Sequence, residues 1–235
     1  MSTLFMIATP IGNLGDISLR ALETLNSVDI IACEDTRHTL KLLSHYDIHK
    51  PLISCHSYNE QQGAKKIISL LSEGKEVAYC SDAGTPGLSD PGALLVQMAR
   101  AAGYKVVPIP GPSAFACLIS ASGLQGRTFL FDGFLSPKAG KRRTRLRELL
   151  DRGEPFILYE SPFRIGKLLA DIASIDPERR LCIGRELTKI HEEITEGKAK
   201  ELALRFFAEP AKGEFCILVH GEKPESYADC MENES

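Results

Sequence analysis

Short apolar runs alternate along the chain with segments whose apolar residues are spaced by threes and fours. In the first half the runs predict buried strands at residues 4–8, 29–33, 52–54, 77–80 and 105–109, with amphipathic helices between them. One helix is predicted over 39–46, another is expected to be capped by Asp16, and a third to start with Asp90 as N-cap and Pro91 next. Strands that alternate with helices form parallel sheets, so this half is predicted to be an α/β domain.

The alternation continues in the second half with less regularity. Apolar runs predict strands at residues 128–131, 155–159, 181–184 and 214–219, with an amphipathic segment at 199–207. Pro110-Gly111-Pro112 is the clearest boundary, so we expect an N-terminal α/β domain at 1–110 and a C-terminal α/β domain at 111–223. No periodicity is present from 224 to 235, which predicts a flexible tail.

A long loop rich in Gly and Pro follows the strand predicted at 77–80, with the sequence SDAGTPGLSDPG at 81–92. A connection from strand to helix usually takes about two to six residues, and a longer one is more often a ligand-binding loop. Glycine lets backbone amides approach a ligand at the strand ends where α/β sheets bind small molecules. A second loop of this kind, Thr9 to Asn13, leaves the first strand. A long structural turn is the alternative interpretation.

Six consecutive polar residues follow the second predicted strand, with the sequence Glu34-Asp35-Thr36-Arg37-His38-Thr39. They stand where an α/β sheet presents functional groups. The alternative is a capping cluster, with Asp35 or Thr36 as the N-cap and Arg37 in solvent. Capping alone explains one residue of the six.

Other strand ends carry weaker signals. A lone His beside a helix cap, such as His56, is more often structural than catalytic, and Asn59 with Gln62 resembles a capping box. The small residues from Ser113 to Cys117 fit a flat ligand near a helix start and a tight contact between helix and sheet equally well. Charged clusters follow two later strands, at 160–164 and 185–189.

A basic run spans Lys138 to Arg147, where six of ten residues are Lys or Arg and no acid occurs until Glu148. In a chain of net charge −3, this concentration indicates contact with a phosphate backbone. A solvated helix face is the alternative. The predicted RNA-binding residues are Lys138, Lys141, Arg142, Arg143 and Arg145.

Composition excludes several classes of protein. Seven cysteines without a C-x-x-C pair indicate buried small side chains in a reducing compartment. The first residues lack a basic n-region and no apolar segment approaches the roughly 20 residues of a membrane helix, so we expect a cytoplasmic protein with no membrane contact. No metal-ligand spacing, G-x-S-x-G elbow or P-loop is present, so no metal is expected. Group transfer onto nucleic acid fits what remains.

Taken in order, several stretches resemble the motifs of the tetrapyrrole methylase-like family of class III S-adenosylmethionine-dependent methyltransferases, in its branch that acts on small-subunit ribosomal RNA. The resemblance covers roughly Leu4 to Lys223. Porphyrin methylases carry G-D-P where this chain has Gly84-Thr85-Pro86. The stretches are residues 4–16, 34–39, 81–87, 110–114, 160–162 and 185–189.

The resemblance implies two α/β domains with the cofactor cleft between them, and a homodimer. It also implies 2′-O-methylation of a cytidine ribose in the decoding region of 16S ribosomal RNA, either as RNA or in the 30S particle. Carried over by position, the residues that contact S-adenosylmethionine are Pro10, Ala83, Gly84, Thr85, Leu88, Ser113, Ala114, Tyr159 and Glu214. The segment 56–60 departs from the family pattern, which leaves the role of Ser57 open.

The predicted catalytic residues are Glu34, Asp35 and Arg37. Asp35 would act as the general base or would orient other groups, and Arg37 would fix the target phosphate. Alternatively, Glu34 and Asp35 only organise the loop and no residue acts as a base. Two other functions stay open, a tetrapyrrole (precorrin or uroporphyrinogen) methylase and a non-enzymatic S-adenosylmethionine-binding protein. The basic run argues against the first, and the intact polar strand ends argue against the second.

Overall fold

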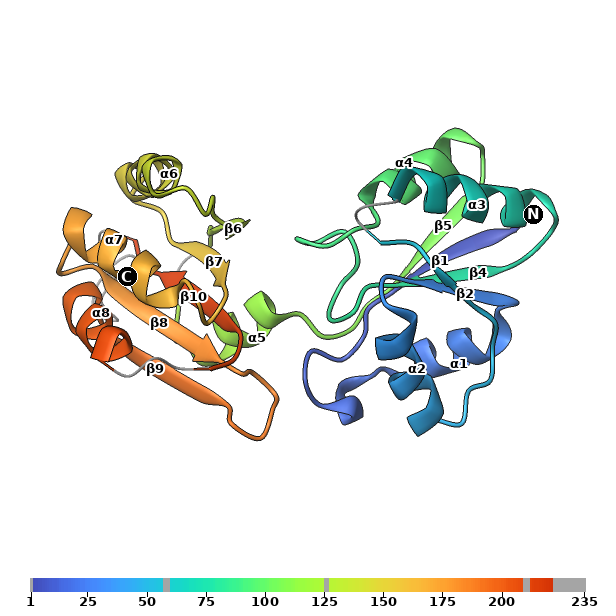
Figure 1. The fold of residues 1–235 in the computed structure, drawn as a ribbon, viewed down its shortest axis with the longest axis horizontal. Helices are drawn as coiled ribbons and strands as arrows, with labels where there is room; N and C mark the ends of the chain where they lie inside the picture. Colours follow the sequence, from blue (N-terminus) through green and yellow to red (C-terminus); the bar gives the residue numbers. More distant parts are fainter. Residues whose placement is uncertain (1, 57–59, 125–126, 209–211, 222–235) are drawn as a thin grey trace, which may run out of the picture. The chain divides into compact units, whose positions relative to one another are not determined.

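The computed structural model describes residues 2–56, 60–124, 127–208 and 212–221 (Figure 1). The chain divides into two compact units, residues 1–113 and 114–235, which we call unit 1 and unit 2. The sequence had placed this boundary between residues 110 and 111. The predicted tail at 224–235 and the residues Ser57 and Asn59 lie outside the described part of the chain.

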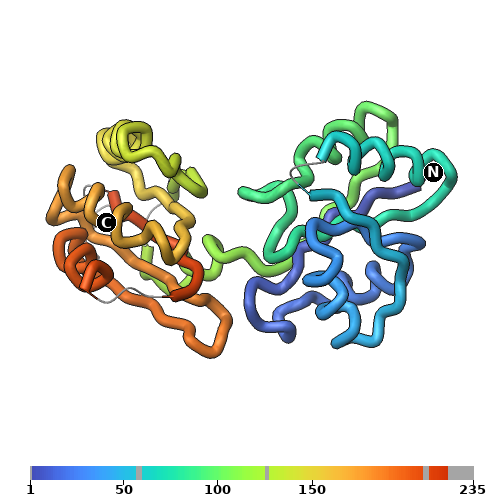
Figure 2. Tube along the Cα trace, viewed as in Figure 1, coloured from blue at the N-terminus to red at the C-terminus, as the bar shows by residue number. Residues whose placement is uncertain are grey.

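Unit 1 contains a five-stranded parallel sheet with the order β3-β2-β4-β1-β5. The strands that meet in its centre come from distant parts of the sequence, and the tube in Figure 2 shows them side by side. The prediction of a parallel α/β sheet in the first half is confirmed. Its strands are β1 (Thr3–Ile7), β2 (Ile30–Cys33), β3 (Leu52–Ser54), β4 (Val77–Cys80) and β5 (Lys105–Ile109).

Helices cover both faces of this sheet. On one face α1 (Leu19–Ser27) and α2 (Thr36–His45) pack against strand residues such as Ala78. On the other face α3 (Glu60–Ser72) and α4 (Ala93–Ala101) pack against residues such as Tyr79. Since successive strand residues point to opposite faces and both faces are covered, the strand ends and their loops are the places left for function.

Three predicted helix starts in unit 1 are wrong. Helix α1 has Ser18 as its N-cap, whose hydroxyl accepts the Ala21 N–H at 3.1 Å, while Asp16 lies in the short 3₁₀ turn η1 (Leu14–Asp16). Helix α2 begins at Thr36, three residues before the predicted start. The N-cap of α4 is Gly92 and not Asp90, because the chain turns there with a φ of 127°, which favours glycine.

Unit 2 contains a five-stranded mixed sheet with the order β6-β7-β10-β8-β9. Strand β6 is parallel to β7 with an irregular register after Phe131, and the remaining pairs are antiparallel. The predicted strand at 128–131 starts later, and β9 was not predicted. The strands are β6 (Leu130–Phe134), β7 (Phe156–Glu160), β8 (Arg180–Arg185), β9 (Glu193–Lys198) and β10 (Phe215–Val219).

The helices of unit 2 are divided unequally between the two faces of its sheet. Helices α6 (Ala139–Asp151), α7 (Ile165–Ile175) and α8 (Ala199–Ala208) bury one face around residues such as Leu168. Helix α5 (Ala114–Ala121) packs on β10, and Leu118 comes so close to the other face that a Cβ on Gly184 would lie 3.0 Å from its side chain. The second face is therefore covered by one short helix.

The burial of the cysteines agrees with the prediction made from the sequence. In the described residues, five cysteines are buried thiols outside any disulfide, as predicted, and Cys117 is half-buried. The five are Cys33, Cys55, Cys80, Cys182 and Cys216. None of the helices in the described ranges has both the length and the apolar character that crossing a bilayer requires.

Candidate functional site

Three loops of unit 1 meet at the carboxyl ends of β1, β4 and β5. Thr9 and Gly84 exchange both backbone hydrogen bonds, at 2.9 and 3.0 Å, and join the loops after β1 and β4. The Thr85 hydroxyl donates to the Pro112 carbonyl at 3.4 Å and joins the loops after β4 and β5. Six of the predicted cofactor residues, Pro10, Ala83, Gly84, Thr85, Leu88 and Ser113, lie in these loops.

Glycines allow these loops to approach one another. Gly84 has a φ of 73°, and a Cβ there would lie 3.4 Å from the side chain of Ile11. A Cβ on Gly111 would come 3.0 Å from that of Ala8, so the β5 loop runs directly against the end of β1. The strand ends thus present closely spaced backbone groups, which suits a small ligand.

The hydroxyl of Ser113 is a candidate ligand contact. Its oxygen is buried and has no hydrogen-bond partner among the described residues. A buried polar atom without a partner costs free energy, so a ligand that satisfies it gains affinity. The position fits S-adenosylmethionine, which carries amino, carboxylate, ribose and adenine groups that can donate or accept hydrogen bonds.

A second cluster forms beside these loops, at the ends of β2, β3 and β4. The Asp35 N–H donates to Asp82 Oδ1 at 2.9 Å, and the Ser54 hydroxyl donates to the Glu34 carbonyl at 3.4 Å. Burial raises the pKa of the Glu34 carboxyl, and the negative charge of Asp82 raises it further, while His56 opposes the shift. A carboxylate with a raised pKa beside a ligand loop is a candidate proton acceptor.

Asp35 has the structural position that the capping interpretation gave it. It is the N-cap of α2, and its carboxylate accepts the Arg37 N–H at 2.8 Å. The Arg37 side chain donates two more hydrogen bonds to it, at 3.1 and 2.8 Å, and these bonds hold the pKa of Asp35 well below its usual range. Such a carboxylate is a weak base, whereas the side chain of Arg37 is 89% exposed and can meet an anion.

The loop after β4 is also held at its far end. Glu60, the first residue of α3, accepts the Gly92 N–H at 3.0 Å. A Cβ on Gly92 would lie 3.2 Å from the ring of Tyr79, so the loop passes close over the core there. Both ends of the loop are therefore anchored, and the segment between them contains the predicted contacts Thr85 and Leu88.

The other three predicted cofactor residues, Ala114, Tyr159 and Glu214, belong to unit 2. Ala114 begins α5, and the Tyr159 hydroxyl accepts the Phe115 N–H at 3.2 Å. The Glu214 N–H donates to Glu186 Oε1 at 2.9 Å, and Lys189 Nζ donates to both carboxylates at 2.8 and 2.9 Å. Glu214 is thus bound to the charged cluster at 185–189 that the sequence had singled out.

The basic run is less uniform than its sequence indicates. Arg142 is only 4% exposed, and its guanidinium donates to Asp171 at 2.8 Å and to the Pro137 carbonyl at 3.3 Å. A side chain held in this way is not available to a phosphate, so we remove Arg142 from the predicted RNA-binding residues. Its acidic partner lies 29 residues further along the chain.

Arg145 is also paired. It donates to Asp132 and, at 2.9 Å, to Glu148, and these bonds raise its pKa. Lys138, the N-cap of α6, and Lys141 and Arg143 within the helix are exposed, and Arg143 Nε lies 3.8 Å from Asp171 Oδ1. The acids that balance part of the run come from distant positions, which is why the sequence showed an excess of charge.

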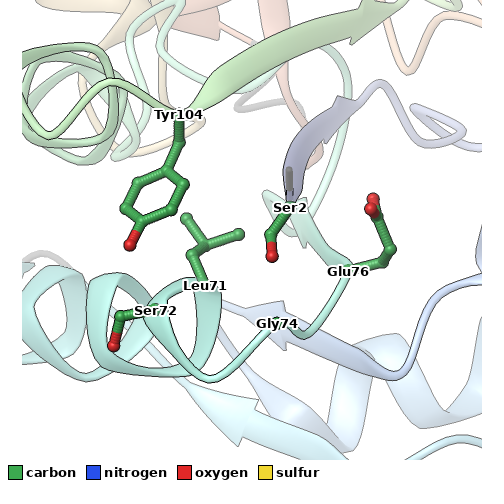
Figure 3. A pocket seen from close by; sticks show the side chains of 6 residues that line it. All are labelled: Ser2, Leu71, Ser72, Gly74, Glu76 and Tyr104. Carbon is green, nitrogen blue, oxygen red and sulfur yellow. The ribbon is translucent and has the colours of Figure 1, made fainter.

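Metal-ligand clusters and a surface cavity bear on the limits of the site. Within the described ranges, no group of three or more His, Cys, Asp or Glu side chains could hold a metal ion. A surface cavity of about 350 Å³ lies at the opposite, amino end of the unit 1 sheet (Figure 3). Ser2, Leu71, Ser72, Gly74, Glu76 and Tyr104 line it. Ligands of α/β sheets bind at the carboxyl ends, so this cavity receives no role here.

The family of the chain is shown by a sequence comparison. The sequence model of the family described as Tetrapyrrole (Corrin/Porphyrin) Methylases matches residues 3–203. The chain belongs to this family, and it is a methyltransferase whose methyl donor is S-adenosylmethionine. Both the predicted family and the predicted cofactor are confirmed.

Curated relatives indicate which branch of the methylase family the chain resembles. The chain is 49% identical to "Ribosomal RNA small subunit methyltransferase I" of Borrelia garinii subsp. bavariensis, over 92% of this chain and 97% of the relative. It is 44% identical to the protein of the same name from Neisseria meningitidis serogroup B, over 98% of this chain and 80% of the relative. The Vibrio cholerae protein of that name is 47% identical, over 93% and 77%.

Solved structures agree on the fold. A cobalt precorrin-4 methyltransferase, a cobalamin biosynthetic enzyme, matches with a TM-score of 0.67 at 16% identity, over 93% of this chain and 94% of that one. The uroporphyrin-III-C-methyltransferase of Thermus thermophilus matches with a TM-score of 0.65 at 17% identity, over 100% and 98%. At this identity the likeness extends to the fold alone.

Sequence reasoning missed one residue of the site. Asp82 was quoted only as part of a loop motif, yet its side chain joins the loop after β4 to the start of α2. Asp82 stands in the loop after β4, and β4 lies next to β2 in the sheet. The order of the strands along the chain does not reveal this pairing, so the contact of Asp82 with Asp35 could not be predicted.

Proposed function

We propose that the chain transfers a methyl group from S-adenosylmethionine to the 2′-hydroxyl of a cytidine ribose in the decoding region of small-subunit ribosomal RNA. Relatives at 44–49% identity that bear the name of a small-subunit ribosomal RNA methyltransferase support the substrate. The observation that carries the proposal is the loop after β4, which contacts Thr9 of a glycine-rich loop on one side and Asp35 of the acidic cluster on the other.

The donor would be held first by unit 1. Backbone groups around Gly84 and the unsatisfied hydroxyl of Ser113 provide hydrogen bonds, and Pro10 and Leu88 provide apolar contact. Contacts from Ala114, Tyr159 and Glu214 of unit 2 remain part of the proposal. S-adenosylmethionine supplies an electrophilic methyl group on a sulfonium, so the chain itself has to align the acceptor oxygen and manage its proton.

Glu34 is the residue best suited to take that proton. In the transfer, the ribose oxygen forms a bond to the methyl carbon, the carbon–sulfur bond breaks, and the hydroxyl proton moves to the Glu34 carboxylate. Burial and the neighbouring Asp82 raise the pKa of Glu34, whereas Arg37 lowers that of Asp35. Two roles were predicted for Asp35, general base and orienting residue. The proposal gives it the second, the orientation of Arg37.

Arg37 would bind a phosphate next to the target nucleotide. Its side chain is exposed and is held by the two hydrogen bonds that it donates to the Asp35 carboxylate, so its guanidinium is both charged and oriented. The exposed cations of α6, Lys138, Lys141 and Arg143, would contact phosphates further along the RNA. A homodimer and a cytoplasmic location also remain part of the proposal.

A substrate comparison tests the proposed function. The enzyme is incubated with labelled S-adenosylmethionine and, in parallel, with undermethylated small ribosomal subunits, deproteinised small-subunit RNA and uroporphyrinogen III. The proposal predicts label in RNA, in subunits or in both, and none in the tetrapyrrole. Label in the tetrapyrrole alone would favour the competing methylase, and donor binding without transfer to any acceptor would favour a binding protein.

A further inference from the structure

Five aromatic side chains of unit 2 form a continuous series of ring contacts. Neighbouring ring centroids lie 6.1 Å apart for Phe129 and Phe115, 5.2 Å for Phe115 and Phe131, 5.0 Å for Phe131 and Tyr159, and 5.6 Å for Tyr159 and Phe134. We call these five residues the aromatic surface. Contacts at such distances stabilise the positions of the rings.

The aromatic surface lies on the less covered face of the unit 2 sheet. Along β7, Phe156 and Leu158 point into the core with α6, α7 and α8, so the alternating residue Tyr159 points to the other face. Phe134, the last residue of β6, is paired with Tyr159 in the register and packs edge-on against its ring. Helix α5 packs on β10, and its first turn reaches β6 through the contact of Phe115 with Phe131, while Phe134 at the end of β6 stays exposed.

The series ends in exposed rings on both sides. Phe134 is 54% exposed and Phe129 is 39% exposed. Tyr159, between Phe131 and Phe134, is fixed because its hydroxyl accepts the Phe115 N–H. Phe134 therefore presents an apolar ring to solvent on a rigid support, which is the arrangement that proteins use to stack nucleic-acid bases.

Exposed basic residues lie close in the chain to these exposed rings. Phe134 is followed closely in the chain by the exposed Lys138 and Lys141 at the start of α6, and the exposed Arg127 precedes Phe129 by two residues. Nearby acids are already paired, Asp132 with Arg145 and Glu160 with Arg164. An exposed ring that is followed within a few residues by exposed lysines complements a nucleotide, whose base is flat and whose phosphate is negative.

We propose that Phe134 stacks against an unpaired base of the RNA substrate, while Lys138 and Lys141 bind its phosphates. This inference rests on the proposed function and adds to it the mode of recognition: the enzyme reads single-stranded RNA next to the methylated ribose or along the same strand. A duplex buries its bases in the stack, so only an unpaired or extruded base can reach the ring.

Tryptophan fluorescence tests the stacking directly, because the chain contains no Trp. Phe134→Trp creates a single reporter, and Phe207→Trp, at a position 81% exposed on α8, is the matched control. Deproteinised small-subunit RNA is titrated against each variant. Stacking predicts saturable quenching of the Phe134→Trp signal, at the RNA concentration that a filter-binding assay gives, and little change for Phe207→Trp.

A kinetic assay of a variant without the ring is a second test, and it does not require deproteinised RNA to bind tightly. Phe134→Leu keeps an apolar side chain without a ring, and Phe207→Leu is its control. In methylation assays, Phe134→Leu should raise the KM for small ribosomal subunits about 5- to 100-fold and leave kcat nearly unchanged. An unchanged KM together with unquenched Phe134→Trp would overturn the inference.

Other occupants give different results. Quenching of the Phe134→Trp signal by S-adenosylmethionine alone would mean that the ring contacts the methyl donor. A change of oligomeric state in Phe134→Leu, measured by light scattering, would mean that the ring contacts another copy of the chain. Either result overturns the stacking of RNA. Wild-type enzyme is assayed in parallel: if it methylates subunits while Phe134 variants behave as controls, the inference fails alone, and if it methylates no RNA, the proposed function fails.

Discussion

Asp82 Oδ1 accepts the backbone N–H of Asp35 at 2.9 Å, which joins two strand ends that are 47 residues apart in the sequence. The bond connects the loop that carries the predicted donor contacts to the loop that carries the acidic cluster. It also brings the Asp82 charge to Glu34 and so contributes to the raised pKa of that carboxyl. The proposed positioning of the donor loop and the proposed proton transfer to Glu34 therefore both depend on the Asp82 side chain.

The pH dependence of methyl transfer tests Glu34. Activity requires its ionised form, so kcat should rise with pH through a pKa above the usual value of about 4.3 for Glu. Asp82→Asn keeps an acceptor for the Asp35 N–H and removes the charge, so this limb should move to lower pH. Glu34→Gln should lower kcat by about 10²- to 10⁴-fold without weakening donor binding. If the rise of kcat occurs at the same pH in Asp82→Asn as in the wild type, the charge of Asp82 does not raise the pKa of the catalytic group. Full activity of Glu34→Gln would exclude Glu34 as the base.

The pairing of Asp35 with Arg37 predicts that the two residues act as one unit. Asp35→Asn keeps a capping oxygen but weakens the hold on the guanidinium, so it should raise KM for RNA, as Arg37→Ala does. The double variant should be no worse than Arg37→Ala alone, which a double-mutant cycle in methylation assays measures. Additive losses would mean that Asp35 acts independently, and unaltered turnover of Asp35→Asn would leave it only its capping role.

Gly84 tests the donor loop. Gly84→Ala forces a side chain into a left-handed conformation and toward Ile11 and Pro112, so it should weaken S-adenosylmethionine binding. Gly103→Ala imposes similar backbone strain at a φ of 81° with no atom within 4 Å of the new Cβ. Each should cost about 1–2 kcal/mol of stability, seen in urea unfolding. Calorimetric titration should show weaker donor binding for Gly84→Ala alone, and equal affinities would contradict the assignment of the loop.

Adjacent arginines on α6 should respond in opposite ways. Arg142→Ala removes the ion pair of 2.7 Å with Asp171 and leaves this half-buried carboxylate only the more distant Arg143 Nε, at 3.8 Å, so it should destabilise the protein by about 1–3 kcal/mol. Arg143→Ala should change stability by less than about 0.5 kcal/mol and weaken RNA binding, with a salt dependence reduced by about one phosphate contact. Denaturation and filter binding at several salt concentrations measure both. Weaker RNA binding by a fully stable Arg142→Ala protein would restore Arg142 to the interface.

The sequence predicted the unit 1 sheet well because its strands are continuous apolar runs, buried on both faces, as at Val77 to Cys80. Strand β9 was missed because its alternate residues Ile194, Glu196 and Lys198 are exposed and two of them are charged, so the segment resembles a polar loop. The prediction for Arg142 failed because Asp171, its partner, comes from another helix. Contacts between distant elements, such as the Asp35 N–H with the Asp82 carboxylate, decide the site and leave no local pattern in the sequence.

The position of the methyl group in the RNA is the most direct test of the proposed function. Small ribosomal subunits are methylated with labelled S-adenosylmethionine, and their RNA is hydrolysed in alkali, which cleaves a phosphodiester only where the neighbouring 2′-hydroxyl is free. The proposal predicts label in one alkali-resistant dinucleotide that begins with cytidine, and its loss with Glu34→Gln enzyme. Label released as mononucleotides would place the methyl group on a base and contradict the account.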